Sequence, residues 1–447
     1  MRGMQKRIVY WLAAALLSPA SLLAAPTVVG RDDQHLGVAS CAGNTCHGST
    51  RPFKDSKIRQ DEYFVWQRKD AHAQAWLTLT SERSEAIARR LGLGPAEQAQ
   101  ECLVCHAESA SQRGPRYQVS DGIGCEACHG AAERWIEPHA KGFHSLDERL
   151  EAGLYPTWDV HARAKLCASC HSGDPQHPMT HAIMAAGHPP ILFELDTFQA
   201  LTPPHWQIDE DYVRRKGPQD PARNWIVGQV AASIALLENL AGPRLGHGIF
   251  PELAFFDCDA CHHSMKAGRA RAERSAGLAL GNVPAADAPL VMLGRWLDVV
   301  EPSLGERWDD QLRQFHIAGS AGTEALQAQA RAMLAELHQS VLPKTDATVP
   351  SESLRRLIGR IVADARQSHS GDYEHAQQTA MAVSVLTTAL VERGHAEVSD
   401  AQRAAVDALY NQVQDRDRFS AGSYAAALDR LSGAFHASAP SGIAGSP

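Results

Sequence analysis

Residues 122–129 read GIGCEACH, and the part Cys125–His129 is the unit around which the chain is organised. It holds two cysteines separated by two residues, with a histidine directly after the second cysteine. The unit recurs along the chain, and all ten cysteines fall into five such pairs. The pairs are Cys41/Cys46, Cys102/Cys105, Cys125/Cys128, Cys167/Cys170 and Cys258/Cys261, and they are followed by His47, His106, His129, His171 and His262.

The histidine at a fixed offset distinguishes between three kinds of cysteine chemistry. Disulfides in exported proteins need an even number of cysteines, but they have no use for a neighbouring histidine. Zinc ribbons use paired cysteines, but they do not require histidine as the next residue. Covalent c-type haem requires both features, because two thiols bond to the porphyrin and the adjacent histidine is the proximal ligand of the iron. The pattern therefore predicts five c-type haems, with iron bound by the five histidines that follow the pairs.

The first copy, CAGNTCH at residues 41–47, is irregular because four residues separate its cysteines. Gly43 and Asn44 tolerate left-handed backbone, which suits a chain that loops outwards between the two thiols. The adjacency of Cys46 and His47, which places the imidazole beneath the iron, is retained. We interpret this segment as a haem site, and a disulfide or a lost site is the alternative.

Electron-transfer haems usually bind a second imidazole on the other side of the iron. The haem region contains several histidines outside the motifs that are candidates for this distal position. The candidates are His72, His139, His181, His188 and His247. A weaker set consists of His144, His161, His177, His205 and His263, and we expect His35 to be a loop residue.

The order of segments is similar to that of a known family. LGVASCAGNTCH, DAHAQAWLTL, ECLVCHAES, GIGCEACHGAAERWIEPH and LCASCH resemble the tetrahaem cytochrome c-554 family and the related haem cores of hydroxylamine oxidoreductase and octahaem reductases, over about residues 35–265. The resemblance implies that His72 and His139 are distal ligands and that the iron at His106 lacks a strong sixth ligand. The sequence departs from the family in its long first spacer, its fifth site and its C-terminal extension.

Composition and patterning indicate four segments. Residues 1–25 have a basic start and an apolar run, which predicts a secretory signal peptide and a periplasmic or otherwise exported protein; an uncleaved anchor is the alternative. No later segment is long and apolar enough to span a membrane. We expect a pentahaem cytochrome domain at 26–270, a helical bundle at 271–436 and a disordered tail at 437–447.

The C-terminal third contains no cysteine and has helical periodicity. Apolar residues at helical spacing occur at 290–300, 324–342, 352–367, 373–394 and 401–413, which predicts a bundle of five or six helices. The predicted fold class is therefore mainly α, with a haem core containing little sheet. We expect the histidines of this part to face solvent or the core; they are His316, His338, His369, His375 and His395.

Two functions follow from these features. The first is electron transfer through five haems in a respiratory chain, with another cytochrome or a membrane quinol-oxidising complex as redox partner. The second is an oxidoreductase that acts on a small nitrogen or sulfur compound, of the hydroxylamine, nitrite or tetrathionate class, at an open haem beside His106. In that case Glu108 and Arg113 either assist a bound ligand or are ordinary surface charges, so enzymatic activity stays open. The net charge of −8 makes nucleic acid a poor partner.

The mass of the mature protein tests both the haem count and the signal peptide. We expect the mass of a chain that begins near residue 26 and carries five covalently attached haems. A mass corresponding to four haems would contradict the interpretation of CAGNTCH as a haem site. A chain that retains residues 1–25 would favour the membrane anchor.

Overall fold

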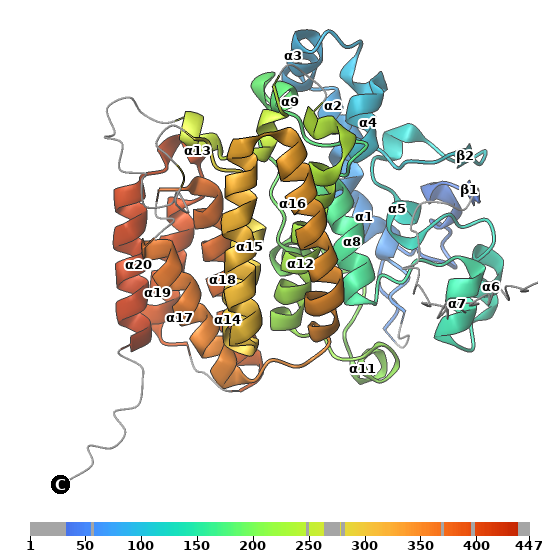
Figure 1. The fold of residues 1–447 in the computed structure, drawn as a ribbon. Helices are drawn as coiled ribbons and strands as arrows, with labels where there is room; N and C mark the ends of the chain where they lie inside the picture. The colour runs from blue at the N-terminus through green and yellow to red at the C-terminus, as the bar shows by residue number, and fades with distance from the viewer. Residues whose placement is uncertain are drawn as a thin grey trace, which may run out of the picture.

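The computed structural model describes residues 33–54, 58–246, 250–262, 278, 282–367, 371–394 and 398–436. It confirms the mainly α fold class. Within these residues the only sheet pairs β1 (Gln34–His35) with β2 (Gln112–Arg113) in parallel. Figure 1 shows a bundle of long helices on one side of the molecule and many short helices on the other. The predicted signal peptide, the predicted tail and the predicted boundary at residue 270 lie outside the described residues.

The N-terminal part consists of short helices joined by loops. Apart from α12, none of its described helices is longer than 12 residues. They are α1 (Glu62–Lys69), α2 (Ala75–Leu79), α3 (Glu82–Arg90), α4 (Gln100–His106), α5 (Cys125–His129), α6 (Ile136–Lys141), α7 (Leu146–Ala152), α8 (Val160–His171), α9 (His181–Ala185), α10 (Leu195–Leu201), α11 (Glu210–Lys216) and α13 (Cys258–Cys261). Such short elements bury few of their own side chains, so their positions depend on what packs between them.

Helix α12 (Pro221–Ala241) joins this part to the bundle. The Asp220 side chain caps its first turn, and Pro221 occupies the first helical position, where its missing N–H costs nothing. The helix is apolar on nearly all sides. It packs against α8 of the N-terminal part and against three bundle helices, α14, α16 and α18, whose ranges follow.

Within the described residues the C-terminal bundle contains seven helices, which is two more than the five segments with apolar helical periodicity and one more than the upper end of the predicted five or six. Its helices are α14 (Ala288–Val300), α15 (Pro302–Ala321), α16 (Thr323–Glu336), α17 (Ser351–Gln367), α18 (Tyr373–Glu392), α19 (Asp400–Gln412) and α20 (Ala421–His436). The additional helices are α15 and α20. In α15 the buried side chains are widely spaced, at Leu304, Trp308 and Phe315, and charged residues between them obscure the pattern. One continuous hydrophobic core runs through α12 and the bundle.

Charged side chains inside the bundle are paired. Arg295 of α14 is 7 % exposed and forms ion pairs with Asp298 at 3.1 Å and with Asp309 at 2.5 Å. His316 and His375 are also buried, and the Asp287 carboxylate lies 2.9 and 3.3 Å from their Nε2 atoms. These two histidines are therefore core residues.

The remaining C-terminal histidines also match the sequence expectation where they are described. His338 is exposed, whereas His369 and His395 lie outside the described residues. None of the helices in the described ranges combines the length and the apolarity that a bilayer span requires.

Trp308 provides a test of the bundle core. Its side chain is fully buried, and its indole N–H donates to the Leu290 carbonyl at 2.9 Å. Trp308→Ala should lower the free energy of unfolding by about 3–5 kcal/mol, measured by circular dichroism during chemical denaturation. Ile317→Ala on the same helix, where the side chain is 44 % exposed, should change it by about 0.5 kcal/mol or less. Equal effects of the two substitutions would contradict this packing.

Candidate functional site

Four of the five cysteine motifs lie at the end of a helix. Helices α4, α5 and α8 end at the motif histidine, and α13 ends at Cys261, one residue before His262. Residues three apart share one face of a helix, so the two thiols of each pair point to the same side. The helical conformation therefore presents both thiols and the histidine to a common space.

The first motif reaches the same arrangement without a helix. The His47 amide donates to the Cys41 carbonyl at 3.1 Å, and in the last motif the His262 amide donates to the Cys258 carbonyl at 2.7 Å. The first cysteine and the histidine are thus joined by the same hydrogen bond in both motifs. The Gly43 carbonyl accepts from the Cys46 amide at 2.8 Å, which closes a turn around the additional residues. All ten cysteines have free thiols, so no disulfide forms within or between the motifs.

Every motif histidine faces one other histidine. The facing residues come from different segments of the chain, and the ring centroids are 5.9–6.3 Å apart. The five pairs are His47–His139 at 5.9 Å, His171–His72 at 6.2 Å, His106–His188 at 6.3 Å, His129–His205 at 6.3 Å and His262–His181 at 6.2 Å. We call these the histidine pairs.

The separation fits a metal ion between the two rings. A metal–imidazole bond of about 2 Å, plus about 1.1 Å from the nitrogen to the ring centre on each side, gives a centroid separation of about 6.2 Å. The rings are too far apart for a hydrogen bond between them. The donor set is chemically suitable as well, because two imidazoles on one iron are a common axial pair in electron-transfer haems.

Hydrogen bonds orient several of these rings. The Nδ1 atoms of His47 and His72 contact the carboxylates of Glu62 at 2.9 Å and Asp70 at 3.0 Å. Because a carboxylate only accepts, Nδ1 carries the proton, and in the neutral ring Nε2 keeps its lone pair. The same carboxylates raise the pKa values of His47 and His72. Metal-binding histidines are held in this way by groups around the site.

The pair at the second motif is oriented by backbone carbonyls. Nδ1 of His106 donates to the Ala75 carbonyl at 3.0 Å, and Nδ1 of His188 donates to the Pro189 carbonyl at 2.7 Å. Both rings therefore also keep the Nε2 lone pair free. Of the five pairs, this one has direct Nδ1 acceptors on both of its members.

Burial keeps other rings in the neutral form that binds metal. It lowers the pKa of His129 to about 3 and that of His171 to about 4. The pKa values of His139, His188 and His205 are also lowered by burial. At neutral pH these imidazoles are unprotonated and able to act as ligands.

Four of the five distal candidates face a motif histidine, namely His72, His139, His181 and His188. The fifth, His247, lies outside the described residues. His205, from the weaker set, faces His129 instead. Its sequence signal is the preceding Pro203–Pro204, which fixes the backbone just before the histidine.

The other weaker candidates do not face a motif histidine. His161 lies against Asp346, His177 pairs with Asp174, and His144 is exposed. His263 lies outside the described residues.

Contacts between motifs place the sites in a row. The thiols of Cys41 and Cys125 are close enough to influence each other's pKa, as are those of Cys105 and Cys170. Cys128 lies near Cys167, which links the third motif to the fourth.

Helix α9 continues the row to the fifth motif. His181 at its start faces His262, and His188, just after its end, faces His106. The order is therefore first, third, fourth, second and fifth motif. At the two ends of the row, Cys46 and Cys261 are the exposed cysteines.

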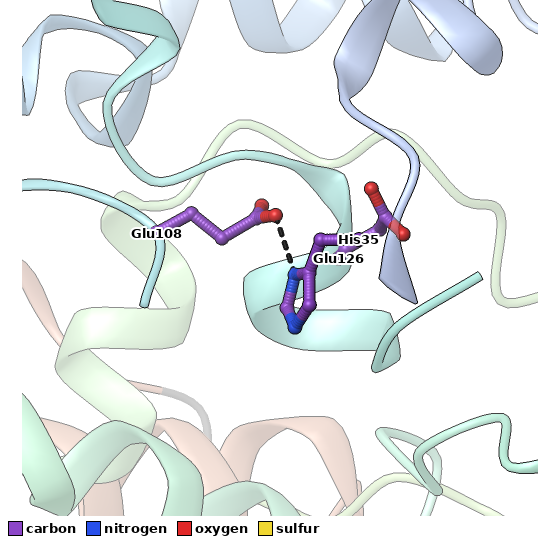
Figure 2. Close-up of side chains that lie close together, drawn as sticks. All are labelled: His35, Glu108 and Glu126. Carbon is purple, nitrogen blue, oxygen red and sulfur yellow. Dashed lines mark hydrogen bonds and ion pairs between the residues drawn. The ribbon is translucent and has the colours of Figure 1, made fainter. Parts of the chain in front are cut away.

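A buried cluster of His35, Glu108 and Glu126 lies among the first three motifs (Figure 2). His35 Nδ1 contacts Glu108 Oε1 at 2.7 Å, and Glu108 Oε2 accepts from the Ala127 amide at 3.1 Å. The Glu126 carboxylate, which Figure 2 shows apart from that pair, has three backbone donors. They are the amides of Leu36 at 2.9 Å, Gly37 at 2.7 Å and Ala132 at 2.6 Å.

This cluster has the residue types of a metal site, but its oxygens are already engaged in hydrogen bonds. Its role is structural, because these hydrogen bonds join the segment before the first motif to α5 and to the segment that follows α4. The sequence interpretation of Glu108 as a surface charge is wrong, since it is 6 % exposed. His35 is a member of this cluster rather than a plain loop residue. Arg113 is exposed, and its guanidinium lies 5.1 Å from the centre of the Tyr117 ring.

Comparison with known proteins gives one family. Residues 40–130 match the family described as cytochrome c554 and c-prime, and this range covers the first three cysteine motifs. No curated protein and no solved structure matches the chain. The paired thiols and adjacent histidines of these three motifs lie inside the matched range. Over residues 40–130 the chain is thus similar to the cytochrome c554 and c-prime family, and this match supports a multihaem c-type cytochrome.

Proposed function

We propose that the protein is an exported electron carrier that holds five c-type haems in a row. The observation that carries the proposal is the histidine pairs: among the described residues, each motif histidine faces one other imidazole. When bound, each haem supplies an iron that gains or loses one electron. The two imidazoles of a pair would occupy both axial positions, which leaves no position for a substrate.

The proposal assigns the thiols and ligands residue by residue. The five cysteine pairs attach the haems, and the five motif histidines are the proximal ligands. His139, His72, His188, His205 and His181 are the distal ligands for the sites at His47, His171, His106, His129 and His262, respectively.

The site at His106 decides between the electron carrier and the oxidoreductase. Family resemblance implies an open iron there, but His188 lies opposite. The loop that carries His188 is fixed by two arginines: Arg90 donates to the Ala186 carbonyl at 2.7 Å, and Arg83 donates to the Gly187 carbonyl at 2.8 Å. Because these two hydrogen bonds fix the backbone directly before His188, they support its role as a permanent ligand.

The helical bundle would support the fifth site. Asp259 lies between the two cysteines of the last motif. Its carboxylate accepts from the Tyr373 amide at 3.0 Å and from Arg416 Nη2 at 3.0 Å. Both donors belong to the bundle, so we infer that the bundle positions this end of the row.

Electrons would enter and leave at the ends of the row, where a cysteine of the first and of the last motif is exposed. The partners would be another cytochrome or a quinol-oxidising membrane complex of a respiratory chain. The basic and apolar N-terminal sequence supports export to the periplasm. The net negative charge favours partners with basic docking surfaces.

Replacement of His188 tests the proposal at its critical site. His188→Ala should open one iron, so that the reduced protein binds one equivalent of carbon monoxide and the oxidised protein gains one high-spin signal. Free imidazole should restore the low-spin spectrum. His177→Ala is the matched control, since His177 is 43 % exposed and faces no motif histidine. Stoichiometric binding of carbon monoxide by the unsubstituted protein, unchanged in His188→Ala, would overturn the proposal and favour the oxidoreductase.

A further inference from the structure

Two cations share one aromatic ring beside the first and third motifs. Arg149 of α7 and Lys216 at the end of α11 lie 5.9 and 5.8 Å from the centre of the Trp158 ring. Lys216 also lies 4.8 Å from the centre of the Tyr212 ring. Cation–π contacts with these rings hold the two charges near each other. We call Arg149 and Lys216 the cation pair.

The cation pair has no acidic partner in the described part of the chain. Neither residue forms an ion pair with a described carboxylate, and the Arg149 Nε atom is buried without a hydrogen-bond partner. The neighbouring Arg215 differs, because it pairs with Asp211 at 2.7 Å. Burial and the nearby Arg215 charge lower the pKa of Arg149, and burial together with the charges of Arg149 and Arg215 lowers the pKa of Lys216 to about 8.

An unbalanced pair of half-buried like charges is costly. Withdrawing each charge from water carries a desolvation penalty, and the two charges repel each other. Protein structures normally compensate such groups with an anion. A guanidinium and an ammonium that converge from two helices suit a carboxylate or another oxyanion.

The location indicates which anion would bind. The centre of the Phe143 ring lies 6.0 Å from the Arg149 guanidinium and 6.3 Å from the centre of the His139 ring. The Tyr155 amide, three residues before the indole ring that both cations share, donates to the His129 carbonyl at 2.9 Å. Each haem carries two propionate carboxylates at one edge of its ring. The cation pair lies beside the first and third sites, where such an edge would need compensation.

We propose that Arg149 and Lys216 form a carboxylate-binding site for propionates of the haems held by His47–His139 and His129–His205. The inference rests on the proposed function, because it requires haems at these two sites. A free small oxyanion in the same place would use the same chemistry, and the experiment distinguishes these two sources.

The test compares Lys216→Gln and Arg149→Gln with Arg214→Gln in the intact holoprotein, by spectroelectrochemical titration. Arg214 is 66 % exposed and forms an ion pair with Asp211, so it is the matched control. A positive charge beside a propionate stabilises the reduced haem, so its removal makes reduction of that haem less favourable. We expect the midpoint potentials of two haems to fall in each cation-pair variant, and those of the other three to stay unchanged. The shifts should persist in about 1 M salt, where long-range fields are screened.

Titration of the holoprotein with inorganic phosphate distinguishes haem propionates from a free oxyanion as the anion that fills the site. If propionates fill the site, phosphate leaves the potentials of the unsubstituted protein unchanged. If a free oxyanion fills it, phosphate shifts two potentials in the unsubstituted protein but none in Lys216→Gln, which would overturn the assignment to propionates. Unchanged potentials in both variants, with and without phosphate, would overturn the carboxylate site altogether.

Haem content separates this inference from the proposed function. Five covalent haems by mass, together with unchanged potentials in both variants, contradict the cation pair alone. Fewer than five haems contradict the proposed function itself. Thermal unfolding of each variant confirms that the compared proteins are equally folded.

Discussion

The opposition of two imidazoles across about 6 Å is the constraint on which the N-terminal part of the structure depends. One member of each pair is fixed in sequence, directly after a cysteine, whereas its partner comes from a different segment. Five such requirements bring residues 41–47 next to α6 and bring α9 between two motifs. The short helices and long loops are the result, since each segment needs only to deliver a thiol or an imidazole to the right place.

The distribution of buried side chains agrees with this view. The bundle and α12 share one extensive apolar core that includes Trp225, Trp296 and Trp308. In the described residues of the N-terminal part the apolar clusters are smaller, such as the one formed by Leu79, Ala88 and Ala96. A part of the chain with so little apolar packing of its own needs another source of buried contact, and haem rings between its segments would supply it. The bundle is held together by an ordinary apolar side-chain core, and α12 connects it to the N-terminal part.

Much of this could be predicted from sequence, and the failures have physical reasons. The cysteine motifs are local patterns, so their chemistry could be inferred from the spacing alone, whereas their place at helix ends was seen only in the structure. A facing histidine is defined by a contact in space, and the Pro203–Pro204 dipeptide before His205 does not indicate that His205 faces His129. The burial of Glu108 could not be predicted, because the partner of its carboxylate is His35, which is distant in the chain. Helix α15 was missed because its few buried residues are diluted by charged ones.

The central claim is that every iron has two histidine ligands, and electron paramagnetic resonance of the oxidised, unsubstituted protein tests it most directly. Spin quantification against the haem content would give the number of haems in each spin state. The account predicts five low-spin ferric haems and no high-spin signal. A high-spin signal that accounts for one haem in five would contradict it, because it would show that one motif histidine has no ligand opposite.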